Sequence, residues 1–273
     1  MQLFQLKNKK METVVQAVPS ARLYSYEVAN LQGIGTRNTQ EDSFTFVNAL
    51  DVTQIQKNGM MFIVADGMGG MMDGKLASEI VVANMKEDFL AMDRTKDIAL
   101  QLKESVFNAG EKVFKVLGGN GGSTVVAGIL FMEQFYFASV GDSYLFLKRG
   151  TQLYRINREH NVLTQKLLEY ISSESTEIRI ADISPEADAL TQFLGMDGMQ
   201  EVDFFRKPLP LQENDIILAC SDGIGSVLSQ QAIFSCMEKK TSQDICSALE
   251  KEILAQKNKN QDNYTALVIK CAY

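Results

Sequence analysis

The sequence contains a single histidine, no tryptophan and only four cysteines in 273 residues. One imidazole is too few for a zinc or iron centre built from several histidines, and a Ser-His-Asp catalytic device would have to depend on His160 alone. The four cysteines include no CxxC pair, so we expect buried, reduced thiols. Any chemistry that this chain performs is therefore expected to be carboxylate chemistry.

The sequence also lacks an excess of basic residues and a long apolar run. Its 27 basic and 34 acidic residues give a formal charge of -7, which is unsuited to gripping nucleic acid. No stretch approaches the roughly 18 uninterrupted apolar residues of a membrane span, and residues 1–7 show no basic leader before an apolar run. We expect a cytoplasmic monomer that binds neither nucleic acid nor membrane.

What the sequence does contain is enough apolar material, 45% of the residues, for one large domain with a substantial core. No internal repeat or composition shift divides the chain, so we expect a single domain over residues 1–273. Residues 60–65 are apolar throughout, which is typical of a strand buried on both faces. Apolar spacing and turn residues predict further strands at 31–35, 43–47, 123–132, 134–140, 144–148, 151–156, 215–219 and 264–271, and helices at 75–92, 95–117 and 241–256.

Two segments do not fit this regular pattern. Residues 1–20 are polar and mixed, and are interpreted as an edge strand or a loose terminus. Residues 158–200 are polar and irregular, and a connection of this length inside a compact domain usually has a role, such as a lid over a site. We therefore interpret residues 158–200 as a variable flap.

One theme recurs four times along the chain: an apolar strand runs into an aspartate that is followed by a small or polar residue. The four instances are Asp66, Asp142, Asp222 and Asp262, and a fifth acidic group, the pair Glu41-Asp42, lies in the turn between the first two predicted strands. Each alone is consistent with an ordinary turn. Together they are unusual, because clustered carboxylates repel one another and lose hydration. Divalent cations such as magnesium and manganese prefer this oxygen-rich environment, so the pattern predicts a metal site.

Two such ions held a few ångströms apart activate water and suit the hydrolysis of phosphate esters. A substrate phosphate then needs a cationic partner. Arg37 lies four residues before Glu41, and its guanidinium can hold a phosphate through two hydrogen bonds. A solvent-facing arginine in a turn is the alternative interpretation, and the residues alone leave both open.

Six short motifs occur in order over residues 30 to 270. They are Arg37-Asn38-Thr39-Gln40-Glu41-Asp42, Asp66-Gly67-Met68-Gly69-Gly70, Gly122-Ser123-Thr124, Gly141-Asp142-Ser143, Ser221-Asp222-Gly223 and Asp262-Asn263-Tyr264-Thr265. Each motif is weak alone, but together the series resembles the metal-dependent protein phosphatases of type 2C, in their compact bacterial form. The resemblance implies an α+β fold, a four-layer α-β-β-α sandwich of two antiparallel sheets flanked by helices, with the metals in a cleft at one end.

The resemblance also implies a ligand set for two manganese or magnesium ions. Asp66 would bridge both ions, and Asp222 and Asp262 would complete the shell of one. The carbonyl of Gly67 would join the other ion, with Glu41 and Asp42 binding directly or through water.

Arg37 would hold the substrate phosphate, and Asp142 would contribute to a possible third metal. The implied activity is hydrolysis of phosphoserine and phosphothreonine in proteins, by a water activated between the two ions. Relatives of this kind typically oppose a serine/threonine kinase, so a kinase and its targets are the expected partners.

The sequence departs from the family pattern at four positions. Gln40 replaces the usual asparagine, which is expected to change only a contact behind the metals. Met68 stands where some relatives carry a histidine thought to protonate the leaving group, so water or the metals are expected to assist. Tyr144 replaces the usual arginine after Gly-Asp-Ser. Ser226 replaces an acidic residue that would help bind the third metal, which puts that site in doubt.

Other interpretations of individual motifs are weaker. Residues 69–75 nearly form a P-loop, but Leu76 stands where the magnesium-binding hydroxyl belongs and Asp73 would repel an anion; glycines that allow a close turn are the better interpretation. Cys220 is not followed six positions later by the arginine of cysteine-dependent phosphatases, so a core role is favoured. His160 is interpreted as structural, with proton donation as the alternative.

Two alternatives to a protein phosphatase remain open. One is a binding protein that keeps this fold without turnover, although the survival of Asp66, Asp222 and Asp262 favours an enzyme. Another is a hydrolase of small phosphate esters, which would share the site and differ only in the walls of the cleft. The pair Met71-Met72 is interpreted separately, as core filler or as an adaptable surface that faces the substrate.

Overall fold

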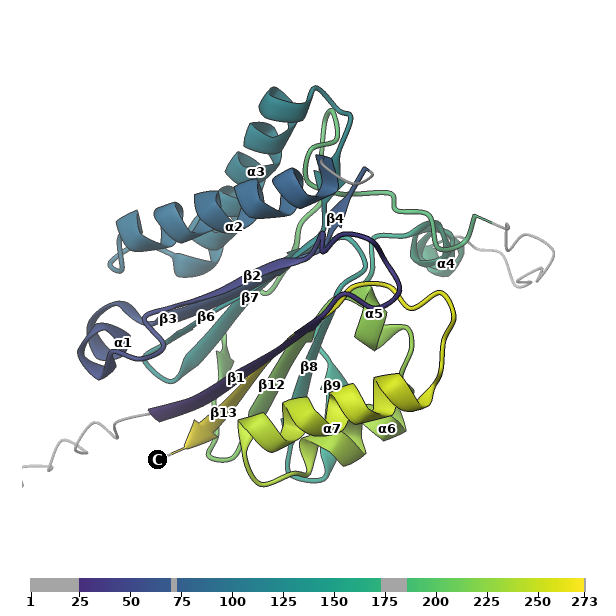
Figure 1. The fold of residues 1–273 in the computed structure, drawn as a ribbon. Coiled ribbons are helices and arrows are strands. Elements are labelled where there is room, and N and C mark those ends of the chain that lie inside the picture. The colour runs from purple at the N-terminus through teal and green to yellow at the C-terminus, as the bar shows by residue number, and fades with distance from the viewer. Residues whose placement is uncertain (1–24, 70–72, 173–185, 273) are drawn as a thin grey trace, which may run out of the picture.

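The computed structural model describes residues 25–69, 73–172 and 186–272. Two antiparallel sheets form its centre (Figure 1). The first, sheet A, is five-stranded. Its strands, in spatial order, are β1 (Ser25–Gly33), β13 (Tyr264–Ala272), β12 (Ile216–Cys220), β8 (Tyr144–Arg149) and β9 (Gln152–Arg155).

The second sheet, sheet B, is six-stranded and faces the first. Its strands are β10 (Asp203–Phe204), β7 (Gln134–Val140), β6 (Val125–Phe131), β3 (Met60–Ala65) and β2 (Ser43–Val47), with β11 (Leu209–Pro210) also paired to β7. A separate two-stranded ladder joins β4 (Gly67–Met68) to β5 (Gly122–Ser123).

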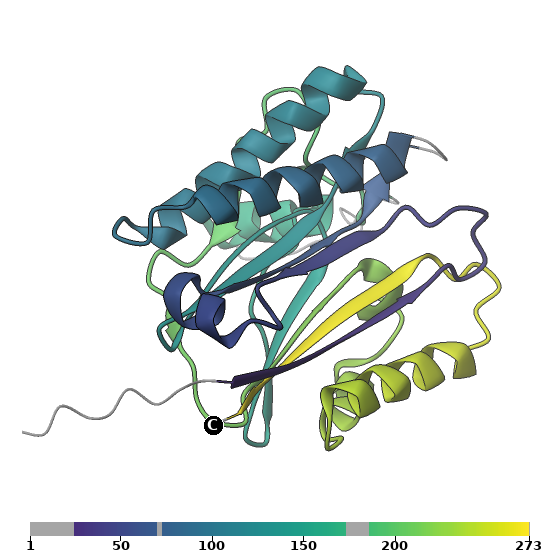
Figure 2. The ribbon, with the colours of Figure 1, turned by 60° about the vertical axis from the view of Figure 1, so that its left-hand side comes forward.

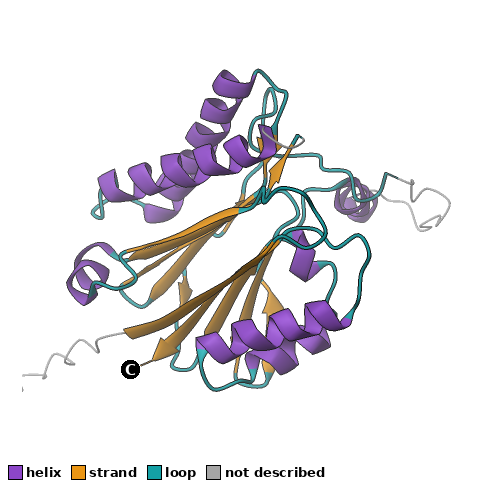
Figure 3. Ribbon diagram, viewed as in Figure 1, coloured by secondary structure: helices purple, strands orange, loops and turns teal. Residues whose placement is uncertain are grey.

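Helices cover the outer face of each sheet, which gives four layers (Figures 2 and 3). The pair α2 (Asp73–Ala91) and α3 (Ile98–Leu117) packs on sheet B. The pair α6 (Gln230–Met237) and α7 (Ser242–Ala255) packs on sheet A. The predicted α+β sandwich, α-β-β-α with two antiparallel sheets, is therefore confirmed.

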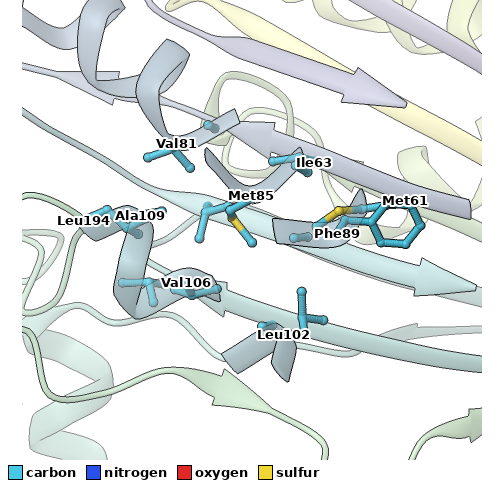
Figure 4. Packing of buried hydrophobic residues seen from close by; sticks show 14 of the residues in the cluster. Met61, Ile63, Val81, Met85, Phe89, Leu102, Val106, Ala109 and Leu194 are labelled. Atoms are coloured by element: carbon cyan, nitrogen blue, oxygen red, sulfur yellow. The ribbon is translucent and has the colours of Figure 1, made fainter. Parts of the chain in front are cut away.

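Three apolar cores lie between the four layers, and single strands supply two of them at once. Along β3, Met61 and Ile63 point towards α2 and α3, whereas Met60 and Phe62 point into the space between the sheets. Successive side chains of a strand lie on opposite faces, so every position of β3 is buried. This explains the continuous apolar run that the sequence shows there. Figure 4 shows the core beneath α2 and α3.

The long helices begin and end at capping residues. The side chain of Asp97 accepts the N–H of Leu100 at the start of α3, and the helix ends at Gly118, whose φ of 61° lies in the left-handed region. At the start of α7, Thr241 and Asp244 form a reciprocal capping box. These ends agree with the predicted helices 95–117 and 241–256 to within a few residues.

The structure corrects several expectations. The first strand starts at Ser25, six residues before the predicted start, because its outer half alternates exposed and half-buried side chains. The segment 158–200 is not irregular throughout, since it contains the helix α4 (Val162–Ser172), none of whose residues is buried. Three short helices were not predicted: α1 (Val52–Asn58), α5 (Asp222–Gly225) and α6.

Two predictions, those for residues 1–20 and for Met71-Met72, lie outside the described residues. In the parts of the chain that the structure describes, no helix combines the length and the apolar composition needed to cross a membrane.

The core between α2 and sheet B predicts a large difference between two neighbouring residues. Phe89 is fully buried, whereas the next residue, Leu90, is 61% exposed. Phe89→Ala should lower the free energy of unfolding by about 3–5 kcal/mol, because the cavity cannot collapse completely. Leu90→Ala, the matched control, should change it by less than about 0.5 kcal/mol. Urea denaturation of both variants measures the difference; equal losses would contradict this packing.

Candidate metal and phosphate site

The sheet topology brings the acidic strand ends to one end of the sandwich. Asp66 follows β3, Asp142 follows β7 and Asp222 follows β12. Because neighbouring strands are antiparallel, β2 starts where β3 ends and β13 starts where β12 ends. Glu41, before β2, and Asp262, before β13, therefore lie at the same end.

These residues line one cavity of about 420 Å³. Seven of the eight predicted site residues contribute to its wall: Arg37, Glu41, Asp66, Gly67, Asp142, Asp222 and Asp262. The other lining residues are Asn38, Thr39, Met68, Gly69, Thr124, Leu190 and Asn263. The strand-end pattern thus identified residues that are far apart in sequence and adjacent in the fold.

Asp66 is the centre of the electrostatic interactions in the cavity. Burial raises its pKa well above the usual value, and the charges of Asp42 and Asp222 raise it further, followed by those of Asp142 and Asp262. Its backbone is fixed on the neighbouring chain, since the Asp66 carbonyl accepts the Thr124 N–H at 2.8 Å. The side chain is thus held where four other carboxylates act on it.

Asp42 is the predicted residue that does not line the cavity. Its side chain is fully buried, and its Oδ2 accepts the hydroxyl of Ser221 at 2.9 Å. Burial raises the pKa of Asp42 to about 6, although hydrogen bonds from Thr265 and Ser221 oppose the shift. Asp42 also lies within hydrogen-bonding reach of Asp66, so the structure places it behind Asp66.

Burial and neighbouring charges also raise the pKa values of two further carboxylates. Burial and the charge of Asp222 raise the pKa of Asp142 to about 7. Burial and the charge of Asp262 raise the pKa of Asp222, whose Oδ1 is buried without a partner among the described residues. A buried carboxylate oxygen without a donor is costly in a protein, and a divalent cation would satisfy it.

Arg37 and Asp262 form an ion pair at the mouth of the cavity, 2.5 Å between Nη2 and Oδ2. Their side chains are 60% and 38% exposed, so the mouth is open to solvent. The structure therefore places a guanidinium beside the carboxylates, as the phosphate-binding interpretation of Arg37 requires. It is not the isolated surface arginine of the alternative interpretation.

A single amide holds the loop that carries Arg37 and Glu41. The Asn263 side chain accepts the Glu41 N–H at 2.7 Å and donates to the carbonyls of Ile34 and Thr39 at 2.9 and 3.0 Å. Sequence reasoning gave Asn263 no role of its own. The signal was its place directly after Asp262 and before a strand, where an amide can bridge to a neighbouring turn.

Glycines allow the backbone to close around Glu41. A Cβ on Gly67 would lie 2.0 Å from the Gly74 carbonyl, and one on Gly74 would lie 2.3 Å from the Glu41 Oε2. A side chain at Gly67 would overlap the backbone, and one at Gly74 would displace the Glu41 carboxylate. This supports the interpretation of these glycines as residues of a close turn, and no phosphate-binding loop is needed to explain them.

Two residues that depart from the family pattern, Gln40 and Ser226, make hydrogen bonds to the backbone near the site. Gln40 accepts the Asp42 N–H at 3.0 Å and donates to the Gly33 carbonyl, so its role is to hold the acidic turn. Ser226 donates to the backbone carbonyl of Asp222 at 2.6 Å and does not line the cavity. Asp142 therefore gains no acidic partner from position 226.

Two rival nucleophile or acid candidates are not in the cavity wall. Cys220 is fully buried, and burial raises the pKa of its thiol, which suppresses the reactive thiolate. His160 is also buried; its backbone N–H donates to the Gly141 carbonyl at 2.9 Å, and burial lowers its pKa. The structural interpretation of both residues is favoured.

The cavity contains the oxygen donors that a divalent metal site needs, but their side chains are not arranged as a ready set of ligands. Over residues 25–69, 73–172 and 186–272, no three His, Cys, Asp or Glu side chains form a ready set of ligands. The donors are nevertheless hard oxygens, several are destabilised by mutual repulsion, and one buried oxygen has no partner. The residues present therefore fit magnesium or manganese better than any soft or nitrogen-preferring metal.

Comparison with known proteins gives a consistent result. A sequence model of the family described as protein phosphatase 2C matches residues 26–169. The serine/threonine phosphatase stp of Listeria welshimeri is 28% identical over 201 residues, which cover 70% of this chain and 77% of that protein.

Solved structures share the fold. Serine/threonine phosphatase Stp1 of Staphylococcus aureus superposes with a TM-score of 0.74 at 20% identity, over 90% of this chain and 95% of the other. The catalytic domain of the phosphatase PstP, described as a complex with two manganese ions, gives 0.71 at 20% identity, over 92% and 100%. Since the sequence model spans more than half of the residues, the chain belongs to the protein phosphatase 2C family and is an enzyme, a protein phosphatase.

Proposed function

We propose that this chain removes phosphate from phosphoserine and phosphothreonine in proteins with the help of two manganese or magnesium ions. The observation that carries the proposal is the single cavity in which Asp66, Asp222 and Asp262 meet with Arg37 at the mouth. When bound, the two ions supply a water activated for attack on phosphorus and neutralise the developing negative charge. The names of the relatives and the two manganese ions of the PstP domain support this assignment.

The carboxylates have separate tasks in this proposal. Asp66, crowded by the other acidic groups, would contribute to holding both ions. Asp222 and Asp262 would hold one ion, while Glu41 and the carbonyl of Gly67 would hold the other.

Asp42 is buried and does not line the cavity, so it would fix the orientation of Asp66 without contacting the ions itself. Asp142 remains a candidate for a third ion.

Arg37 is proposed to bind two of the phosphate oxygens at the cavity mouth. In the structure its guanidinium is paired with Asp262, so binding of an ion by Asp262 would free the arginine for the substrate. Met68 lines the cavity but has no proton to donate. The proton for the leaving serine or threonine oxygen is therefore expected to come from solvent.

The exposed mouth of the site suits a phosphorylated side chain that projects from another protein. We propose phosphorylated proteins as substrates, among them a serine/threonine kinase and its targets, for a single domain over residues 1–273. The cytoplasmic location and the monomeric state remain predictions from the sequence. Assays with purified protein on a phosphothreonine peptide, with manganese, with magnesium and with chelator, test the proposal directly; equal turnover in chelator would contradict it.

Asp222→Asn is expected to abolish phosphatase activity, because the amide no longer neutralises a bound ion. It should not lower the unfolding temperature of the chelator-treated protein, because it removes one of several repelling charges. Asp215→Asn is the matched control: Asp215 is a buried carboxylate at the other end of β12 and pairs with Arg149 at 2.6 Å. This control should lose stability and keep activity. Manganese-dependent turnover by Asp222→Asn would contradict the assignment of Asp222 as a metal ligand.

Arg37→Ala should raise KM for a phosphopeptide by about tenfold or more, since a hydrogen bond to a charged group contributes about 1.5–3 kcal/mol. The effect on kcat should be smaller, because the phosphate contact forms before the transition state as well as in it. Arg37→Lys, which keeps the charge but not the two parallel donors, should lie between. Steady-state kinetics at saturating manganese decides; a loss confined to kcat would argue against this role.

The raised pKa values predict that the metal-free protein loses stability as pH rises. Asp142, with a pKa of about 7, and Asp42, with a pKa of about 6, retain protons in the folded state that the unfolded chain releases near 3.8. The folded state therefore binds more protons between these values, and its stability falls with pH across that window.

Thermal unfolding in chelator should show a midpoint roughly 4 °C lower at about pH 8 than at about pH 5. Saturating manganese should abolish this trend. Asp142→Asn should weaken the trend in chelator, since one of the two groups is removed. A midpoint in chelator that rises over the same interval would contradict the assigned crowding.

A further inference from the structure

Tyr144, the residue that departs from the family pattern after Gly-Asp-Ser, contacts a partly buried arginine. The guanidinium carbon of Arg155 lies 3.9 Å from the centre of the Tyr144 ring, within the range of a cation–π interaction. The two residues come from adjacent strands, since Arg155 of β9 pairs with Phe146 of β8. Tyr144 is two residues from Phe146 on the same face, so the contact is a diagonal cross-strand pair.

Glu159 fixes the position of this arginine. Its Oε1 accepts the Arg155 Nη1 at 2.6 Å, and both side chains are largely buried, at 25% and 20% exposure. Glu159 also accepts a hydrogen bond from Asn161 and lies within hydrogen-bonding reach of Tyr144. Ring, guanidinium and carboxylate thus form one cluster, which we call the Tyr144 clamp (Tyr144, Arg155 and Glu159).

The clamp touches both carboxylate-bearing turns on its side of the cavity. Tyr144 follows Asp142 by two residues, so its ring anchors the end of that turn. The same ring packs against the backbone of Gly225, where a Cβ would meet ring carbons at 2.1 and 2.2 Å. Gly225 is the last residue of α5, the turn that begins with Asp222 at the end of sheet A (Figure 1).

The register of the sheet makes this contact direct. Tyr144 is opposite Cys220, two residues before Asp222. A shift of the ring would therefore displace Gly225, at the end of α5, relative to the Asp142 turn. Two buried nitrogens of Arg155, Nε and Nη2, have no partner among the described residues, so the arginine is held there at a cost that the ring contact and Glu159 offset.

We propose that the Tyr144 clamp positions Asp142 and Asp222 relative to each other, and so determines how tightly the cavity binds divalent ions. The proposal rests on the proposed function for the identity of the ions. The clamp contacts no substrate, and its residues do not line the cavity. Its effect should therefore appear in metal affinity and not in the turnover of the fully loaded enzyme.

Calorimetric titration of manganese into chelator-treated protein measures this directly. Tyr144→Leu and Arg155→Lys should each weaken manganese binding by about tenfold, the lower end of the effect of residues that orient metal ligands. The manganese concentration for half-maximal hydrolysis of a phosphopeptide should rise by the same factor. The kcat at saturating manganese should stay within about twofold of the wild type.

Arg149→Lys is the matched control. Arg149 is on β8 as well, 29% exposed and ion-paired at 2.6 Å, but it contacts Asp215 at the opposite end of the strand. This variant should lose stability and keep wild-type manganese affinity. Arg155→Lys retains the charge and most of the volume, so it carries the test even where Tyr144→Leu does not fold.

Three outcomes would overturn the proposal. One is wild-type manganese affinity in both clamp variants with a lowered unfolding temperature, which would make the clamp a structural brace only. Another is an equal loss of affinity in Arg149→Lys, which would show that any weakening of sheet A has this effect. The third is a wild-type protein that binds no manganese. This result would contradict both the proposed function and the role of the clamp, and the wild-type titration reveals it before any variant is compared.

Discussion

The mutual repulsion of carboxylates at one end of a β-sandwich is the interaction on which this structure depends. Asp42, Asp66, Asp142 and Asp222 all have raised pKa values, first through burial and then, for Asp66 above all, through one another's charge. Such a cluster opposes folding unless protons or cations occupy it. The three apolar cores therefore supply the folding free energy that keeps these carboxylates close together. A divalent cation bound among them would relieve their mutual repulsion.

Two different layers of the fold hold the repelling carboxylates in place. Strands β3 and β12 bring Asp66 and Asp222 from opposite sheets, and the ladders that hold these strands are continuous with the apolar cores. The loops need fewer constraints, because Asn263 ties the Arg37 loop to β13 through three hydrogen bonds. Rigid strands thus fix the carboxylates, while the arginine at the mouth is exposed to solvent.

Much of this arrangement could be predicted from the sequence, because burial on both faces and strand-end carboxylates leave direct signals. The strand at 60–65 and the helices at 95–117 and 241–256 were predicted closely. The helix α4 was missed although its apolar residues recur at helical spacing, because it lies inside a segment that was interpreted as an irregular flap. The place of Asp42 behind Asp66 was not predictable, because adjacent acidic residues give no sign of which faces the cavity. The contact between Tyr144 and Arg155 depends on the register of β8 and β9, which the residues alone do not specify.

The alternation along β3 has a consequence for how this chain can vary. Odd and even positions of the strand fill different cores, and Asp66 is the next residue after its last position. Inserting or deleting one residue within 60–65 would exchange the two sets of side chains and move the carboxylate to the other side of the sheet. Length changes in this strand therefore remove folding and catalysis in one step, whereas surface loops can accept them.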